Sequence, residues 1–193
     1  MSNNNIKIWD IFVRIFHWAL VIAFAVAYIT EDDYEQVHVY AGYTILGLLV
    51  FRILWGFVGS EHARFRSFIV KPSVTLSYLK SIKNKSAERY LGHNPAGAMM
   101  VMALMFSLMA TVLLGLMLYG AEEFSGPLAF LMENVSKSTA HTIEELHEFF
   151  ANFTLFLIVI HVLGVLSASH LHKENLTASM VHGNKKPNQE QSS

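Results

Sequence analysis

Residues 146–170 read LHEFFANFTLFLIVIHVLGVLSASH, a long apolar run that contains two histidines, His147 and His161. Their separation of fourteen residues is close to four turns of α-helix, so both imidazoles project from nearly the same face, about 21 Å apart along the axis. The segment 149–168 has room for the roughly 20 residues of a spanning helix. Because an ionisable side chain is costly in lipid, we expect both histidines to face the protein interior and to do chemistry there.

The composition supports a membrane protein. Of 193 residues, 53% are hydrophobic and 15% are charged, whereas charged residues make up about a quarter of an average soluble domain. The absence of cysteine excludes disulfides, thiolate-bound metals, iron–sulfur clusters and covalently attached haem. Any iron must therefore be held by nitrogen or thioether ligands. We expect one membrane domain over 1–183, followed by a disordered polar tail over 184–193.

Three further apolar stretches precede the run that contains His147 and His161. The run 96–119 carries no charged residue, and it follows Asn94 and Pro95, an expected N-cap and first helical position. The predicted fold class is an all-α integral membrane four-helix bundle, with helices at about 11–29, 37–58, 96–119 and 149–168.

The loops predict the orientation. Basic residues gather before the first span, in the 59–95 connector and in the tail, while the other two loops are acidic. Because short basic loops stay in the cytoplasm, we expect both termini and the 59–95 connector inside. A cleaved secretory signal is the competing interpretation, since Ala23 and Ala25 form a small-x-small site behind an apolar stretch.

Depth sorts four histidines into two levels. Helices 11–29 and 96–119 run outward and the other two run inward, so His17 and His161 lie toward the cytoplasm, and His38 and His147 toward the outside. Each level thus has one imidazole from each of two helices, as axial ligation of a haem from both sides requires. The alternative for any one of them is an interfacial or aromatic-belt residue.

Four other residues fit bound haems. Arg14 shares a face with His17, and Arg52 lies below His38 at the inner level, so either guanidinium could clamp a haem propionate. Gly42 and Gly164 leave space beside the ligands for a flat macrocycle. Each also has a plainer interpretation, because arginines reach toward headgroups and glycines serve helix packing.

The chain also resembles a known family. The motifs are WDIFVRIFHW from Trp9, VHVYAG from Val37, YLGHNPAG from Tyr90, and ELHEFFAN from Glu145 through to His161. Together they are similar to the bacterial cytochrome b561 family, which includes the b-type cytochrome subunit of nickel–iron hydrogenases, and the resemblance extends from Trp9 to about Gly183. It implies two non-covalent haems b, one held by His17 and His161, the other by His38 and His147.

The resemblance implies a function as well. We expect an electron relay in the bacterial inner membrane between the quinone pool and a periplasmic c-type cytochrome or hydrogenase-like redox protein, tuned by ligation and burial. One alternative is a quinone oxidoreductase that uses a small reductant such as superoxide without a protein partner. Another is a proton or ion transporter whose histidines titrate. His93 is expected to cap a loop, or else to meet a propionate or quinone.

Overall fold

Four long helices dominate the chain. The computed structural model describes residues 6–31, 33–84 and 86–186. Within these residues, four helices are long and apolar enough to cross a membrane, namely α1 (Ile11–Ile29), α2 (Glu35–Val58), α4 (Pro95–Glu122) and α6 (Lys137–His172). Helices satisfy every backbone hydrogen bond within one segment, which is the requirement for crossing lipid.

The helix bounds differ from the expected ones mainly in α6. It begins at Lys137, twelve residues before the expected position 149, and it continues to His172. Ser136 caps its start, since its Oγ accepts a hydrogen bond from the Thr139 N–H at 3.1 Å. An apolar run marks only the part of a helix that lies in lipid, whereas the helix itself continues wherever its backbone bonds do. His147 therefore lies well inside α6 instead of at its end.

The start of α4 confirms the predicted cap. The Asn94 side-chain oxygen accepts a hydrogen bond from the Gly97 N–H at 2.7 Å, and Pro95 is the first residue of the helix. Proline suits this position because its missing N–H would have no partner within the helix.

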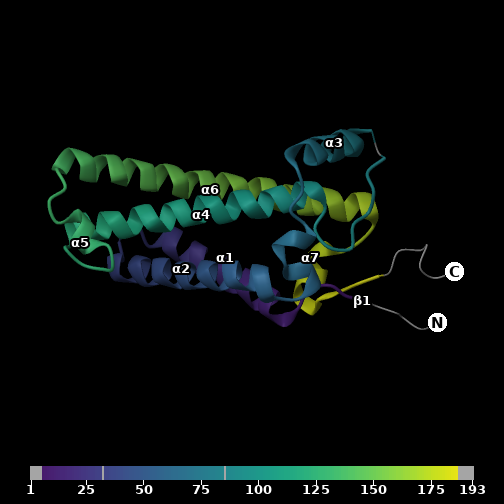
Figure 1. The fold of residues 1–193 in the computed structure, drawn as a ribbon, viewed down its shortest axis with the longest axis horizontal. Helices are drawn as coiled ribbons and strands as arrows, with labels where there is room; N and C mark the ends of the chain where they lie inside the picture. The colour runs from purple at the N-terminus through teal and green to yellow at the C-terminus, as the bar shows by residue number, and fades with distance from the viewer. Residues whose placement is uncertain (1–5, 32, 85, 187–193) are drawn as a thin grey trace. The chain divides into compact units, whose positions relative to one another are not determined.

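The chain divides into two compact units, and each long helix contributes a segment to both. Unit 1 contains Met1–Trp18, Val50–Met102 and Val159–Ser193, and unit 2 contains Ala19–Leu49 and Ala103–Ile158. The short helix α5 (Ala129–Met132) lies in unit 2, in the connector between α4 and α6 (Figure 1).

Unit 2 is a four-helix bundle. Its core combines small and large side chains, with partly buried Ile158 of α6 packed against Ala23, Phe24, Ala27, Ala41, Ile45, Leu49, Leu108, Val112 and Leu116. Small residues let helices approach closely, so that van der Waals contacts hold the bundle together in lipid. Polar contacts also join α4 to α6, as where the Ser107 and Thr154 hydroxyls lie 2.7 Å apart with both residues fully buried.

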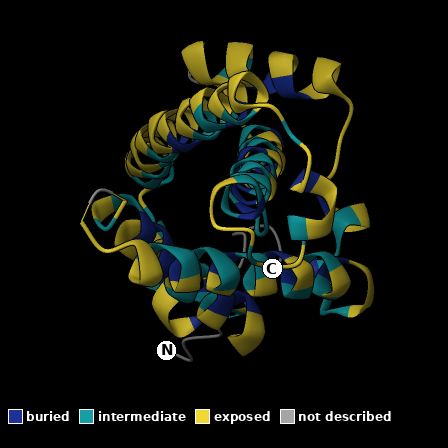
Figure 2. Ribbon diagram, turned by 90° about the vertical axis from the view of Figure 1, so that its left-hand side faces the viewer, coloured by how far each residue is buried: buried dark blue, intermediate teal, exposed yellow. Residues whose placement is uncertain are grey.

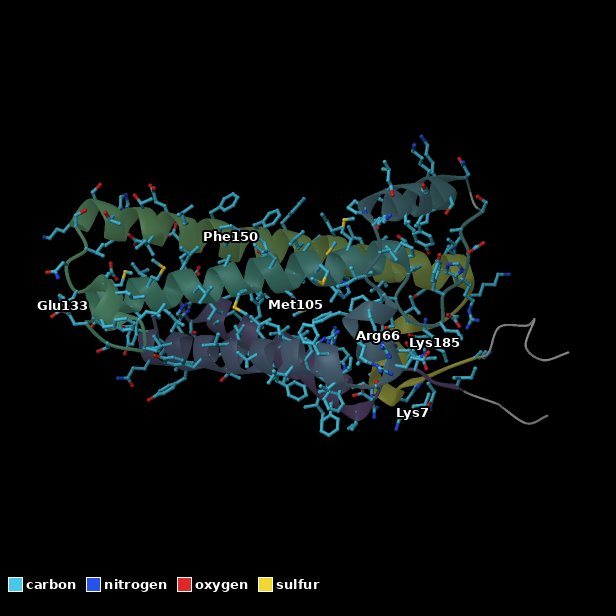
Figure 3. All side chains as sticks on the ribbon, in the orientation of Figure 1. Lys7, Arg66, Met105, Glu133, Phe150 and Lys185 are labelled. Carbon is cyan, nitrogen blue, oxygen red and sulfur yellow. The ribbon has the colours of Figure 1, made fainter. Side chains whose placement is uncertain are left out.

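Unit 1 is built around the two ends of the chain. Strand β1 (Ile6–Lys7) pairs antiparallel with β2 (Asn184–Lys185), which follows the short helix α7 (Leu176–His182). Lys7 and Lys185 come from these paired strands (Figure 3). Next to the strands, the core of unit 1 consists of Ile8, Trp9, Val13 and Ala63.

This pairing corrects the expectation for the tail. The composition predicts disorder from residue 184, but Asn184 and Lys185 form β2, and Lys185 is only 8% exposed. Sequence alone does not reveal the pairing because a two-residue strand has too little hydrophobic pattern to be recognised. The rest of the expected tail, from 187 to 193, lies outside the described residues.

The connector between α2 and α4 carries two 3-10 turns, η1 (Glu61–Ala63) and η2 (Phe65–Ser67), and then the helix α3 (Pro72–Lys83). Thr75 and Tyr78 form the buried strip of α3, while the remainder is largely exposed, as the helix at the top of Figure 2 shows. The Thr75 hydroxyl donates to the Pro95 carbonyl at 3.2 Å, which ties α3 to the start of α4.

Candidate functional site

The first histidine pair lies in unit 1. His17 from α1 and His161 from α6 have ring centres 6.5 Å apart, with an angle of 54° between the ring planes. The His17 Nδ1 is buried and has no hydrogen-bond partner among the described residues. Trp18 meets the His17 ring edge-on at 5.1 Å. These two histidines were predicted to lie at the same depth in the membrane, and in the structure their rings lie near each other.

The second pair lies in unit 2. His38 from α2 and His147 from α6 have ring centres 6.0 Å apart. Each Nδ1 lies 2.9 Å from a backbone carbonyl oxygen, that of Ala27 for His38 and that of Thr111 for His147. Because a carbonyl can only accept, each Nδ1 carries the proton, which leaves the Nε2 lone pair free to bind a metal. Histidines that bind metals commonly use their other ring nitrogen in this way.

A cavity accompanies this second pair, and every residue that lines it belongs to unit 2. Apolar side chains such as Phe24, Leu108 and Leu116 make most of its wall, and Gly42 lines it beside His38. No atom lies within 4 Å of where a Cβ on Gly42 would be, so this glycine leaves open space. The cavity has the apolar lining that is typical of a ligand site.

Gly115 of α4 also lines the cavity, and sequence reasoning missed it. A Cβ at this position would lie 2.8 Å from Cε1 and 3.1 Å from Nδ1 of His147. The His147 ring can therefore reach the Thr111 carbonyl only because position 115 has no side chain. A glycine in an apolar span gave no signal of this approach, since glycines are common in membrane helices.

The two arginines predicted near the site both lie in unit 1. Arg14 donates from Nη1 to the Val181 carbonyl, and its Nε is buried without a partner among the described residues. Arg52 is 3% exposed, its guanidinium carbon lies 4.9 Å from the ring centre of Phe65, and its Nη1 has no partner within the described chain. Gly164 of α6 has open space where a Cβ would be.

His93, for which the sequence left open a loop cap or a contact with a propionate or quinone, lies in unit 1. Its ring lies between Trp9 and Phe68, at centre distances of 4.8 and 4.6 Å. Burial, then the positive charges of Arg52 and Lys185, lower the pKa of His93 to about 3, so its imidazole is neutral. The preferred expectation is a loop cap, but Asn94 caps α4 and His93 is packed between aromatic rings.

Asp10 connects the start of α1 to the end of α2. Its carboxylate accepts hydrogen bonds from the Val13 N–H at 2.9 Å, from Trp55 Nε1 at 3.2 Å and from the Ser60 hydroxyl. Burial alone would raise the pKa of Asp10, and these hydrogen bonds outweigh it, so the pKa lies below its ordinary value. The anionic Asp10 is thus already occupied by three donors.

Neither histidine pair suits a bare metal ion. Among the described residues, no three or more His, Cys, Asp or Glu side chains come together in a group that could hold one, whereas protein zinc sites use at least three side-chain ligands. A metal ion held by two imidazoles needs a bound cofactor that supplies its remaining ligands.

The comparison with protein families settles the chain's membership. The model of the family described as prokaryotic cytochrome b561 matches residues 8–183. The chain belongs to the prokaryotic cytochrome b561 family. No curated protein and no solved structure matches the chain. The resemblance stated from the sequence motifs is confirmed.

Family membership confirms several expectations in their general form. A cytochrome b561 is a helical membrane protein that binds haem b and carries electrons, and the four apolar helices agree with this. The histidine pairs also fit haem b. Imidazole nitrogens bind zinc at about 2 Å, and two rings on opposite sides of an iron at a similar distance have centres roughly 6 to 6.5 Å apart. The roles of the individual histidines as ligands stay a prediction.

Proposed function

We propose that this cytochrome b561 holds two haems b and relays electrons through the membrane between the quinone pool and a periplasmic redox partner. The observation that supports the proposal is the pair of histidine–histidine distances, 6.5 Å in unit 1 and 6.0 Å in unit 2. A single pair would suffice for a one-haem protein. Two separate pairs, each of a spacing suited to bis-imidazole ligation, favour a relay.

In this proposal His17 and His161 would hold the haem iron in unit 1, and His38 and His147 would hold the one in unit 2. A haem supplies a one-electron iron couple when it is bound. The chain fixes the ligand tautomer in unit 2 through the hydrogen bonds to the Ala27 and Thr111 carbonyls. It also keeps water from the unit 2 site through the apolar wall of the cavity.

The predicted supporting residues keep their roles in this proposal. Arg52 is a buried cation and Arg14 a partly buried one, and both lie in the unit that holds His17 and His161, so they are suited to binding propionates. Gly42 and Gly164 provide room beside the ligands, since each has open space where a side chain would begin.

The charge pattern of the loops supports an orientation in a bacterial inner membrane. The 59–95 connector carries Arg64 and Arg66 among other basic residues, which supports a cytoplasmic location for the connector and both termini. The acidic loops then face the periplasm, where they suit a basic patch on a c-type cytochrome or a hydrogenase-like protein. Quinone or quinol would exchange electrons with the protein from the lipid.

The first test counts haems in full-length protein purified in detergent. Wild type is expected to contain two haems per chain with bis-imidazole b-type spectra, and His161→Ala is expected to lose the one in unit 1 while retaining the one in unit 2. His170→Ala is the matched control, because His170 is an exposed histidine on the same helix. Retention of two haems in His161→Ala would refute the ligand assignment.

A second test addresses the relay. Wild-type protein in lipid nanodiscs is mixed with a reduced quinol, and haem reduction is followed by stopped-flow absorbance. Both haems are expected to become reduced, with one of them lagging, and only a single phase is expected in His161→Ala. Haems that stay oxidised in the presence of quinol would argue against the quinone pool as a partner.

A further inference from the structure

We propose that His93 and Arg52 form a carboxylate-binding site in unit 1, which holds a propionate of the haem bound by His17 and His161. The inference rests on the proposed function, since it needs a haem at that pair. It assigns a positioning role to His93, which is neither an axial ligand nor a loop cap.

The first observation is the state of His93 Nδ1. This nitrogen is buried and has no hydrogen-bond partner among the described residues, although aromatic rings fix the imidazole on two sides. A buried polar group without a partner costs about 1–3 kcal/mol, so native proteins rarely keep one without a ligand, an ion or a water to satisfy it. The fixed ring orientation means that the partner must come to the imidazole.

The second observation is Arg52. Its side chain is 3% exposed, yet its Nη1 is unpartnered within the described chain. Phe68 contacts both groups, with its ring centre 5.9 Å from the Arg52 guanidinium carbon and 4.6 Å from the His93 ring centre. The two unsatisfied nitrogens thus belong to side chains packed on one aromatic ring.

Two acids of unit 1, Asp10 and Glu174, are already engaged by other donors. Asp10 is close enough to Arg52 to attract it electrostatically, but its carboxylate already accepts bonds from Val13, Trp55 and Ser60. Glu174 is paired with Arg89 and lies 3.8 Å from Lys185 Nζ. A buried guanidinium is stabilised by an anion with free oxygen atoms, and neither of these two carboxylates has both oxygens free.

The chemistry of the two donors selects a carboxylate. Arg52 offers a permanent cation, and His93 offers a neutral N–H, because its imidazole stays uncharged at physiological pH. One cation with one neutral donor matches a singly charged anion with two oxygen atoms. His93 and His161 are close enough to interact electrostatically, and Arg52 and the proposed ligand pair lie in the same unit as His93.

The test is a cycle that combines protein variants with a modified haem. Full-length protein freed of haem in detergent is titrated with haemin or with haemin dimethyl ester, whose propionates carry no charge. The variants are Arg52→Gln, which removes the cation, and His93→Phe, which keeps an aromatic ring between Trp9 and Phe68. His93→Gln, which restores an N–H donor, is the rescue variant, and His170→Gln is the control.

In wild type, unit 1 is expected to bind haemin roughly tenfold or more tightly than the ester, as the strength of a charge-assisted hydrogen bond implies. Arg52→Gln and His93→Phe should remove most of this preference, and His93→Gln should restore part of it. In the haem-loaded protein, Arg52→Gln should also lower the reduction potential of the unit 1 haem, because a nearby cation favours the reduced iron. The His170→Gln control should behave as wild type.

If wild type and both variants preferred haemin over the ester to the same extent, the proposed carboxylate site would be refuted. A lipid phosphate in its place would predict no ester effect in wild type and less co-purified phospholipid in Arg52→Gln, which would also overturn it. If His161→Ala retained two haems, the failure would instead lie in the proposed function. Should Arg52→Gln not fold, the His93 pair of variants decides the question alone.

Discussion

In unit 2 the histidine pair is held by backbone carbonyls and lined by apolar side chains, whereas in unit 1 the corresponding pair lies in a region of unsatisfied, mostly cationic groups. The buried side-chain nitrogens that lack a partner among the described residues all belong to unit 1, namely those of Arg14, His17, Arg52, Arg64 and His93. The same two-histidine arrangement can therefore be preorganised by the chain itself or be left to be completed by its ligand.

The difference has electrostatic consequences. Glu31 is the charged residue that lines the unit 2 cavity, while arginines dominate the surroundings in unit 1. Positive charge near an iron favours its reduced form, so the two haems are expected to differ in reduction potential even with identical axial ligands. The two units should also differ in how much haem binding stabilises them. In unit 1 the unpartnered groups would gain hydrogen bonds from the haem, whereas the histidines of unit 2 already bond to backbone carbonyls.

The largest effect is expected from His38→Ala. The unit 2 haem should be lost while the unit 1 haem remains, the mirror image of His161→Ala. Haem content and the optical spectrum of the purified protein measure this. Loss of both haems in each variant would show that the two histidine pairs are not independent, and would contradict the description of two separate haem sites.

Gly183→Ala tests the closure of unit 1 by the chain ends. Gly183 ends α7 with a φ of 86°, and a Cβ there would lie 2.6 Å from the Trp9 carbonyl oxygen. The left-handed conformation costs an alanine about 1–2 kcal/mol, to which the backbone contact adds. We expect a lower thermal unfolding midpoint together with weaker haem binding in unit 1, and an unchanged midpoint would contradict this account.

Gly115→Ala tests unit 2 in the same way. The added methyl group should push the His147 ring from the Thr111 carbonyl and weaken the unit 2 haem, with a cost of about 1–3 kcal/mol for overpacking. Gly47→Ala is the control, because nothing lies within 4 Å of its Cβ position in the same unit. A spectrum unchanged at unit 2 would show that the ring moves freely.

Acid should destabilise unit 1 through His93. The pKa falls from 6.5 in the unfolded chain to about 3 in the folded protein, chiefly through burial, so the unfolded state takes up a proton that the folded state refuses. This contribution to stability is complete above about pH 6.5 and is lost as the pH falls toward 3. Between these limits the slope is about 1.4 kcal/mol per pH unit for one proton.

Unfolding midpoints of wild type and His93→Phe between about pH 4 and 8, on either side of the ordinary histidine pKa, measure this contribution, since other histidines affect both proteins alike. The variant is expected to show the shallower loss of stability in acid. Parallel curves would mean that His93 takes up a proton in the folded protein as readily as in the unfolded chain.

The smallest effect is expected from Ser107→Ala in unit 2. It removes the buried bond to Thr154, but the Thr154 hydroxyl still donates to the Phe150 carbonyl at 2.8 Å. The loss should be about 1 kcal/mol of stability, with both haems retained. Ser77→Ala on exposed α3 is the control, with an expected change near zero. A larger loss in Ser107→Ala would mean that this contact organises the bundle.

Several features of this protein are predictable from its amino-acid sequence. The four spanning helices follow from apolar length, because lipid offers no partner for an unpaired backbone group. The matching of His17 with His161 and of His38 with His147 follows from depth, because each residue of a helix advances by a constant rise. Asn94 and Pro95 mark the start of α4 through local capping chemistry alone.

Other features depend on which residues meet across the fold. The polar start of α6 has no apolar signal, so its first twelve residues were missed. The approach of His147 to Gly115, the bonds to the Ala27 and Thr111 carbonyls and the enclosure of His93 by Trp9 and Phe68 join positions far apart in the chain. Periodicity and depth are properties of one segment in its solvent, and the sequence by itself determined them. The hydrogen bonds and close contacts that distinguish one histidine pair from the other exist only after separate helices have packed, so the tertiary structure decided them.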